Sequence, residues 1–363
     1  MAKIISISTA VPAHKHTQQH LQHFMEGAYN AGEKEKRILG YLYTHSGIET
    51  RYSVIPDYTV PMHEWEFYPR SANLEPFPNL EHRMQWFHKH ALPLSLQAAT
   101  KCIDGYIDKA EVTHLVTVSC TGMSAPGLEL QLMEAMDLKP DTARTAINFM
   151  GCYAAIHGLK MANDIVNANP GSKVLVVCTE LCSIHFQKTF TDDTIVAPLI
   201  FGDGSAAVLI CSNDDPRPGI RIDSFYSEVL KNAKDSMSWN LSSNGFVMTL
   251  SADVPDMFLT EIGPLKERAV RKAGYDDNDI KYWCIHPGGK RILEAISKGL
   301  SLTEGDLFYS CDILKNYGNM SSATILFVLA RMWQELIHDH GARIFVAAFG
   351  PGLTMESAIL TMS

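Results

Sequence analysis

Segments that predict β-strands alternate with segments that predict helices along almost the whole chain, and this order constrains the fold more than any other feature. The strand segments are apolar on both faces, which is typical of a sheet covered by helices on each side. Gly or Pro follows several helical segments, where the chain must leave the helix. The alternation predicts an α/β fold. The strand segments are THLVTVSCTG, SKVLVVCTEL, SAAVLICS, DIKYWCIHP, ARIFVAAFG and ESAILTMS.

The order of elements in the first half of the chain recurs in the second half. In the first half, strand THLVTVSCTG is followed by a helix, a second helix that begins near residue 152, and strand SKVLVVCTEL. In the second half, YWCIHPGG is followed by a helix, a second helix that begins near residue 319, and strand ARIFVAAFG. The polar stretch CSNDDPRPG is the best boundary between them. We therefore expect two similar halves, residues 1–215 and 216–363, packed around one site.

The charge and hydropathy of the chain argue against two classes of function. The formal net charge is −9 at pH 7, and no basic run is present that could follow a phosphate backbone, so nucleic acid is not an expected partner. No uninterrupted apolar stretch approaches the length of a membrane span. The N-terminal MAKIISISTAVP predicts a first strand rather than a signal peptide. We expect a soluble, cytoplasmic protein.

The eight cysteines are spread along the chain, mostly within apolar segments. Without a signal peptide, this distribution predicts buried thiols and one catalytic thiol rather than disulfides. Cys178, Cys182 and His185 lie close together in CTELCSIH, but no matching second pair of ligands follows. We therefore expect neither a metal site nor a bound cofactor.

Three short segments each offer one residue with catalytic chemistry. They are Cys152 in NFMGCYAAIHG, His286 in YWCIHPGGKRIL and Asn319 in NYGNMSSATILF. Each lies where a strand or loop gives way to a small-residue turn and then a helix, so its side chain can face a shared pocket. A cysteine at a helix N-terminus feels the positive end of the helix dipole, and a nearby imidazolium lowers its pKa further. The pattern predicts a thiolate nucleophile at neutral pH.

Each of these residues also has an ordinary structural interpretation. A cysteine after glycine is more often a small buried residue, a histidine before Pro-Gly-Gly can be a polar turn residue, and asparagine is a favoured helix N-cap. The joint pattern favours catalysis, because five motifs occur in one order along the chain. They are GCYAA, FGDGSAA, HPGGK, GNMSSAT and FGPGLT.

In these motifs, and over essentially its full length, the sequence resembles the type III polyketide synthases, the chalcone and stilbene synthase-like family, in its bacterial branch. The resemblance implies a thiolase-like αβαβα sandwich of two similar halves in a homodimer. It implies that Cys152 carries the acyl chain, that His286 is its partner and that Asn319 is the second polar catalytic group. The implied substrates are an acyl-CoA starter and malonyl-CoA, and the implied product is a pyrone, a resorcinol or a related aromatic compound.

The implied chemistry explains the residue types. A thiolate exchanges with a CoA thioester in a nearly balanced reaction. Loss of carbon dioxide from a malonyl thioester then places negative charge on its carbonyl oxygen, where donors from His286 and Asn319 would stabilise the enolate. The loss of one such donor typically costs about 3–4 kcal/mol of transition-state stabilisation. The enolate attacks the thioester on Cys152, and repeated rounds lengthen the chain before it cyclises.

The resemblance also implies a set of residues that bind substrate, several of which depart from the plant pattern. Phe201 matches a family aromatic gate, and Met248 stands where plant members have a second phenylalanine. Trp239 falls near a plant glycine, so one arm of the cavity should be shorter or redirected. Further expected pocket residues are Cys120, Cys182 and His185, which replace plant threonines, and the turn Gly350, Pro351 and Gly352. Arg51 and Lys290 are the candidates for binding the CoA phosphates.

Two other readings of the same residues are open. A ketoacyl synthase III-like enzyme shares the Cys-His-Asn set but condenses once with a carrier protein; FGPGLT and the longer N-terminal region favour the iterative enzyme. A papain-like cysteine hydrolase also orders Cys, His and Asn, and here His286 lies 134 residues (286 − 152) after Cys152. The absence of a CGSCW-like surround and of a secretion signal disfavours the hydrolase.

Overall fold

A single mixed β-sheet runs through the molecule, and its strands come from both halves of the chain. The computed structural model describes residues 1–231, 233–303 and 305–363, and in this part the sheet has nine strands in the order β11-β12-β13-β8-β1-β7-β6-β4-β5. Their bounds are β1 (Ala2–Ala10), β4 (His114–Ser119), β5 (Ala143–Asn148), β6 (Val174–Leu181), β7 (Asp203–Ser212), β8 (Ile220–Val229), β11 (Ile280–Ile285), β12 (Arg343–Gly350) and β13 (Thr354–Met362).

The two halves of the sheet are joined by a short stretch of pairing between β1 and β8. These two strands pair only at Lys3 with Arg221 and at Ile4 with Ile220, whereas β1 pairs with β7 along nearly its whole length. On one side, parallel β5, β4 and β6 are followed by antiparallel β7 and β1. On the other, parallel β11 and β12 are followed by antiparallel β13 and β8. The strand directions therefore follow the same order on the two sides of the β1–β8 junction.

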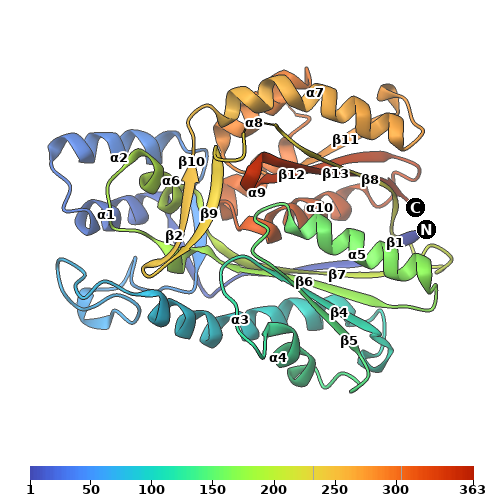
Figure 1. Cartoon of the computed structure of the whole chain (residues 1–363), viewed down its shortest axis with the longest axis horizontal. Coiled ribbons are helices and arrows are strands. Elements are labelled where there is room, and N and C mark those ends of the chain that lie inside the picture. Colours follow the sequence, from blue (N-terminus) through green and yellow to red (C-terminus); the bar gives the residue numbers. More distant parts are fainter. Residues whose placement is uncertain (232, 304) are drawn as a thin grey trace.

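Helices fill the space between the two halves of the sheet and cover both outer faces (Figure 1). From top to bottom the figure shows α7 and α8, one half-sheet, α5 and α10, the other half-sheet, and then α3 and α4. This five-layer order confirms the predicted αβαβα sandwich. The helix bounds are α3 (Leu80–Ile103), α4 (Leu128–Ala135), α5 (Ala154–Ala168), α7 (Val254–Lys272), α8 (Lys290–Gly299) and α10 (Thr324–Leu336).

Strand β6 shows why the strand segments are apolar at every position. Val174, Val176 and Cys178 pack in the cluster formed around α5 and α10, whereas Leu175 and Val177 pack in the cluster that includes α3. Because both faces of the strand are buried, no alternation of polar residues is needed. The middle helix α5 approaches closely through small residues: a Cβ on Gly158 would lie 2.8 Å from Val176 Cγ1.

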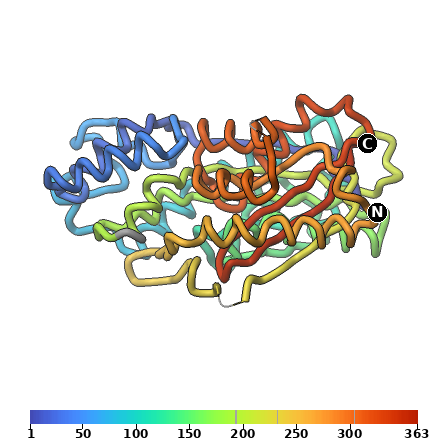
Figure 2. Tube along the Cα trace, turned by 90° about the horizontal axis from the view of Figure 1, so that it is seen from above, coloured from blue at the N-terminus to red at the C-terminus, as the bar shows by residue number. Residues whose placement is uncertain are grey.

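The remaining elements form an extension at one end of the molecule, opposite the two chain termini (Figure 2). It contains α1 (Gln18–Ala28), α2 (Glu33–His45) and α6 (Asp192–Ile200), with the hairpin of β2 (His14–Thr17) and β3 (Thr50–Ser53) beside them. A second hairpin, β9 (Met237–Ser242) and β10 (Gly245–Leu250), and helix α9 (Phe308–Tyr317) complete the fold. No helix in the described ranges has the length and apolar character needed to cross a membrane.

Candidate active site

Cys152 lies directly before the middle helix α5, in a turn that only glycine allows. The preceding Gly151 has φ +89°, and a Cβ there would lie 2.2 Å from the Cδ atom of Pro351. The N–H of Gly151 donates to Cys120 Sγ at 2.9 Å. The turn therefore places Cys152 between the N-terminus of α5 and the Pro351 loop, as the motif GCYAA predicts.

The environment of the Cys152 thiol differs from the sequence-based expectation. Burial raises the pKa of this thiol to about 11; contacts with the Ser321 and Asn319 side chains lower it, and the Glu180 carboxylate raises it. Burial is the largest of these influences and favours the neutral thiol. The direction of this shift is opposite to the thiolate expected from the sequence.

His286 follows β11, and its ring is buried without a hydrogen bond. The residue is 1 % exposed, and neither ring nitrogen has a hydrogen-bond partner among the described residues. Burial lowers the pKa of His286 to about 3, so the imidazole is neutral and the expected imidazolium is not favoured. A buried ring whose donor and acceptor are both unused is uncommon in a merely structural position. It is suited to exchange a proton with a bound substrate.

Asn319 connects the loop of His286 to the nucleophile. Its Oδ1 accepts the N–H of Ser321 at 2.8 Å, which satisfies the turn that leads into α10. Its Nδ2 donates to the carbonyl oxygen of Gly288 at 3.3 Å, two residues beyond His286. The amide also lowers the pKa of the Cys152 thiol, against the larger effect of burial. The amide oxygen of Asn319 therefore serves the turn before α10, as the helix-cap interpretation suggests, whereas its amide nitrogen faces the site.

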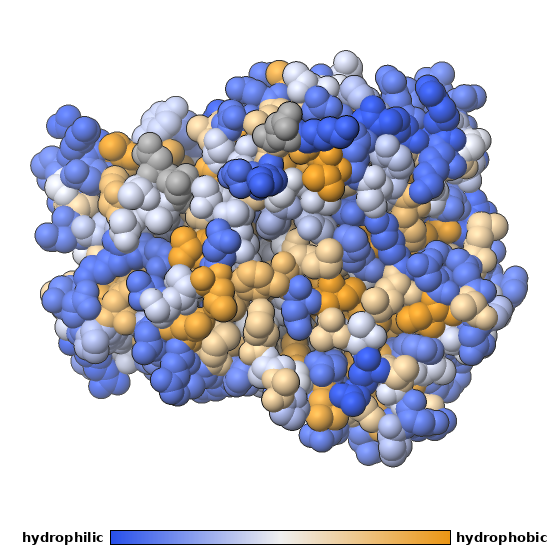
Figure 3. Space-filling view, in the orientation of Figure 1, coloured by the Kyte–Doolittle hydropathy of each residue, from blue (hydrophilic) through white to orange (hydrophobic). Residues whose placement is uncertain are grey.

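Two adjoining cavities share a wall near Cys152, and His286 and Asn319 line neither of them. The first holds about 410 Å³ of empty space, part of it open to solvent, and is lined by Cys152. The second holds about 640 Å³ on the same measure and reaches Leu21 and Met25 of α1. Apolar side chains gather over the middle of the molecular face, whereas polar ones dominate its rim (Figure 3). Both cavities are lined by Cys182, Phe201, Trp239 and Met248.

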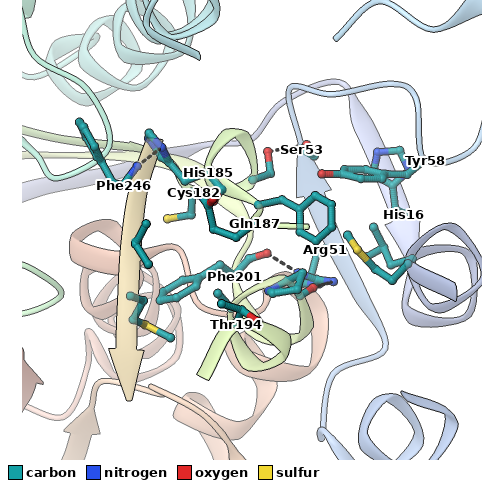
Figure 4. Close-up of a pocket in the computed structure, with 18 of the residues that line it drawn as sticks. His16, Arg51, Ser53, Tyr58, Cys182, His185, Gln187, Thr194, Phe201 and Phe246 are labelled. Atoms are coloured by element: carbon teal, nitrogen blue, oxygen red, sulfur yellow. Dashed lines mark hydrogen bonds between the residues drawn. The ribbon is translucent and has the colours of Figure 1, made fainter. Parts of the chain in front are cut away.

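Most of the expected pocket residues lie on these walls. Cys120 and Pro351 line the cavity of Cys152, and His185 lines the second one. Figure 4 shows Phe201 between the hairpin strand that carries Phe246 and the Arg51 side chain. Gly350 and Gly352 do not line either cavity. A Cβ on Gly350 would lie 3.2 Å from the Cys152 nitrogen, so this residue contributes a close backbone approach.

Arg51 does not have the placement expected of a phosphate ligand. It is 4 % exposed, and its guanidinium donates to Pro198 O at 2.6 Å, to Gln18 Oε1 at 3.0 Å and to Phe201 O. Three of its five N–H groups are thus bound inside the protein and the side chain is buried, so we withdraw Arg51 as a CoA-binding residue. Lys290, the first residue of α8, has a side chain that is 49 % exposed and remains a candidate.

Sequence reasoning missed Glu180, the acid on the inner strand β6. It is fully buried and accepts hydrogen bonds from Cys120 N at 2.9 Å, from Thr121 Oγ1 at 2.8 Å and from Ser322 Oγ. Burial raises the pKa of Glu180 to about 7, although the three hydrogen-bond donors act to lower it. The signal was available in the sequence, since Glu180 is the one acid in the apolar strand SKVLVVCTEL.

Comparison with known families and proteins identifies relatives along the whole chain. The sequence model described as "Chalcone and stilbene synthases, N-terminal domain" matches residues 1–216, and the corresponding C-terminal domain matches residues 221–362. The chain is 34% identical to "Alpha-pyrone synthesis polyketide synthase-like Pks18" of Mycobacterium tuberculosis over 285 residues, which cover 76% of this chain and 72% of that protein.

Two solved structures share the fold over nearly their full lengths. A polyketide synthase of the brown alga Ectocarpus siliculosus superposes with a TM-score of 0.94 at 29% identity, covering 100% of this chain and 98% of that one. The C-terminal type III polyketide synthase domain of Steely1 from Dictyostelium superposes with a TM-score of 0.91 at 28% identity, covering 99% of each. These matches, together with the five-layer fold, exclude the papain-like alternative.

Proposed function

Because the chain belongs to the chalcone and stilbene synthase family, and is thereby a type III polyketide synthase that uses CoA thioesters, we propose that Cys152, His286 and Asn319 carry its reaction. The observation that supports this assignment is the Asn319 amide, which donates to the loop that follows His286 and lowers the pKa of the Cys152 thiol. The unused ring nitrogens of His286 add to it.

The neutral states of the thiol and the imidazole define the first step. When a starter acyl-CoA binds, His286 takes the proton of Cys152 while the sulfur attacks the thioester carbonyl. The CoA sulfur leaves with that proton, and a thioester on Cys152 remains. Because burial disfavours both ions of the pair, proton transfer accompanies attack rather than preceding it.

Condensation then uses the same imidazole as a hydrogen-bond donor. Malonyl-CoA loses carbon dioxide, and the enolate oxygen accepts hydrogen bonds from His286 and from Asn319 Nδ2. The enolate carbon attacks the thioester carbonyl, a carbon–carbon bond forms, and the Cys152 sulfur is released. The lengthened chain is now a CoA thioester and returns to Cys152 for the next round.

We propose an α-pyrone as the product class. The name of the Mycobacterium tuberculosis relative connects it with α-pyrone synthesis. Lactonisation requires only that an enol oxygen of the chain attack its terminal thioester, so it needs no acid or base beyond those already present. The indole of Trp239 on the wall of the Cys152 cavity favours a short, compact product over a larger ring system.

The decisive experiment is product analysis by mass spectrometry with malonyl-CoA and a panel of short, long and aromatic starter CoAs. Cys152→Ala should abolish acyl loading. Asn319→Ala should retain loading but lose decarboxylation by about 10²–10³-fold, the usual loss for one donor of this kind. Cys311→Ala is the matched control, because Cys311 is an exposed thiol outside both cavities. Undiminished polyketide formation by Cys152→Ala would refute the assignment.

We also propose a homodimer and a cytoplasmic location. Strand β5 lies at the edge of the large sheet with exposed residues along most of its length, which leaves a strand edge free to pair with a second copy. All eight cysteines are free thiols, as expected in a reducing compartment. Light scattering of the purified protein would test the dimer, and localisation of a tagged chain would test the compartment.

A further inference from the structure

The β9–β10 hairpin is a wall of the reaction cavity that belongs to no larger sheet. Within the described ranges its two strands pair only with each other. Trp239 and Met248, which face each other across the hairpin, both line the cavity of Cys152. No strand ladder in the described ranges holds this wall: a backbone bond from Leu80 N to Ser243 O fixes the hairpin turn, and side chains connect the hairpin to the nucleophile.

His185 provides one of these connections. Its Nδ1 accepts the backbone N–H of Phe246 at 3.1 Å (Figure 4), and its Nε2 lies 2.7 Å from the carbonyl oxygen of Thr121. A backbone N–H can only donate and a carbonyl can only accept, so the proton must be on Nε2. The ring also stacks on Phe246, with 4.3 Å between centroids and an interplanar angle of 9°.

Trp239 provides a second connection to the same place. Its indole Nε1 donates to the carbonyl oxygen of Cys120 at 2.7 Å. The indole also meets the His185 ring edge to face, with 5.7 Å between centroids. Two side chains thus bind the consecutive carbonyl groups of Cys120 and Thr121, one from the hairpin itself and one bridging to it.

The Cys120–Thr121 dipeptide is in turn bound to the nucleophile turn. Cys120 Sγ accepts the N–H of Gly151 at 2.9 Å, and Gly151 precedes the nucleophile. Thr121 Oγ1 donates to Glu180 at 2.8 Å and accepts the N–H of Leu181 at 2.9 Å, which fixes the dipeptide to β6. Hydrogen bonds therefore run from the hairpin through this dipeptide to the residue before Cys152.

We propose that His185 and Trp239 form a clasp that holds the hairpin wall at a set distance from Cys152, and that both act as positioning residues for condensation. This inference rests on the proposed function. Both residues set the position of the wall through the hydrogen bonds they make as well as through the space they fill. The clasp keeps the malonyl-derived enolate against the acyl thioester during the brief time before a proton reaches it.

The inference predicts a specific failure when the clasp is opened. Malonyl-CoA still loses carbon dioxide, but the enolate carbon takes a proton, and the products are acetyl-CoA and carbon dioxide without a new carbon–carbon bond. The ratio of condensed to released two-carbon units reports this failure. A loss of folded enzyme alone would lower both quantities together and would leave their ratio unchanged.

Trp239→Phe tests the clasp with a small change, because it removes the indole N–H and keeps an aromatic ring. Trp65→Phe is the matched control: the Trp65 Nε1 also donates to a backbone carbonyl, that of Val60, at 3.2 Å, and Trp65 lines neither cavity. We expect the condensed-to-released ratio, measured per acylated enzyme, to fall about fivefold in Trp239→Phe, as for one lost hydrogen bond. It should stay within about twofold in Trp65→Phe.

A second pair of variants separates the hydrogen bonds of His185 from its ring. His185→Phe keeps an aromatic side chain and loses both bonds, whereas the amide in His185→Gln can accept and donate in their place. We expect the ratio to fall in the first variant and to recover partly in the second. Equal ratios in wild type, Trp239→Phe and His185→Phe would overturn the clasp. A wild-type enzyme that forms no polyketide at all would instead refute the proposed function, and the inference with it.

Discussion

Replacement of Glu180 by glutamine should make the protein respond differently to pH, since this buried carboxyl lies near the nucleophile and forms no ion pair with any residue that the structure describes. Its hydrogen bonds come from one backbone N–H and from the Thr121 and Ser322 hydroxyls. A glutamine can keep all three contacts, with its carbonyl oxygen facing Cys120 N and Thr121 and its amide N–H facing a rotated Ser322 hydroxyl. Glu180→Gln therefore removes the titration and preserves the packing.

The sign of the effect follows from the raised pKa. The carboxyl of Glu180 has a pKa of about 7 in the folded chain against 4.5 for the ordinary group. Its stabilising contribution is complete below pH 4.5 and is lost as the pH rises through about 7. The interval of about 2.5 pH units, at about 1.4 kcal/mol each, gives about 3–4 kcal/mol. Relative to wild type, Glu180→Gln should therefore gain about 3–4 kcal/mol of unfolding free energy between pH 4.5 and pH 8.

Urea denaturation at a series of pH values measures this difference, and subtraction of the two proteins cancels every other titrating group. Glu356→Gln is a useful control, because Glu356 is also buried but its pKa is lowered, with Lys160 and His157 beside it. Its contribution changes below about pH 4.5, so the gap between this variant and wild type should stay nearly flat above that pH. A flat gap for Glu180→Gln over the same range would refute the reasoning.

Three further substitutions have expected outcomes. Gly151→Ala should cost more than about 2 kcal/mol of stability and abolish product, because φ is +89° and its Cβ would lie 2.2 Å from a proline ring atom; Gly105→Ala, with φ +74° and open space, should show only the backbone strain. Arg51→Met should cost about 3 kcal/mol in urea denaturation, since it removes the donor from the buried oxygens of Gln18 and Phe201. Lys290→Ala should raise KM for acyl-CoA about threefold without changing Tm. The control Lys298→Ala, at an exposed position on the same helix, should change neither KM nor Tm.

The layers of the fold could be predicted because burial on both faces leaves a local signature. Strand β6 is a continuous apolar run, and its alternate residues pack against different helix layers. Similar runs mark β7, β12 and β13. Cys152 and Asn319, which lie before α5 and α10, could also be found from a local pattern. A turn that exposes a side chain at the start of a helix needs small residues around it.

The protonation states of the site could not be predicted from residue types. A cysteine beside a helix N-terminus and a histidine brought near it suggest an ion pair. Burial instead raises the pKa of Cys152 and lowers that of His286, so the neutral form of each group is favoured. The amount of solvent lost depends on the whole cavity, which no motif encodes. Arg51 was misassigned for a related reason: a basic residue in the sequence gives no sign that neighbouring carbonyls occupy its donors.

The hairpin that carries Trp239 and Met248 shows a different limit. Its connections to the nucleophile use the carbonyl groups of Cys120 and Thr121 and the backbone N–H of Phe246 and Gly151, groups that almost any residue would supply. Side-chain identity at Cys120 therefore matters for the bond to Gly151 but not for the bond to Trp239. His185 and Trp239, by contrast, each contribute the side-chain half of a bond. Substitutions on the clasp should consequently alter coupling between the wall and the nucleophile, whereas Cys120→Ala should loosen the nucleophile turn and leave the hairpin in place.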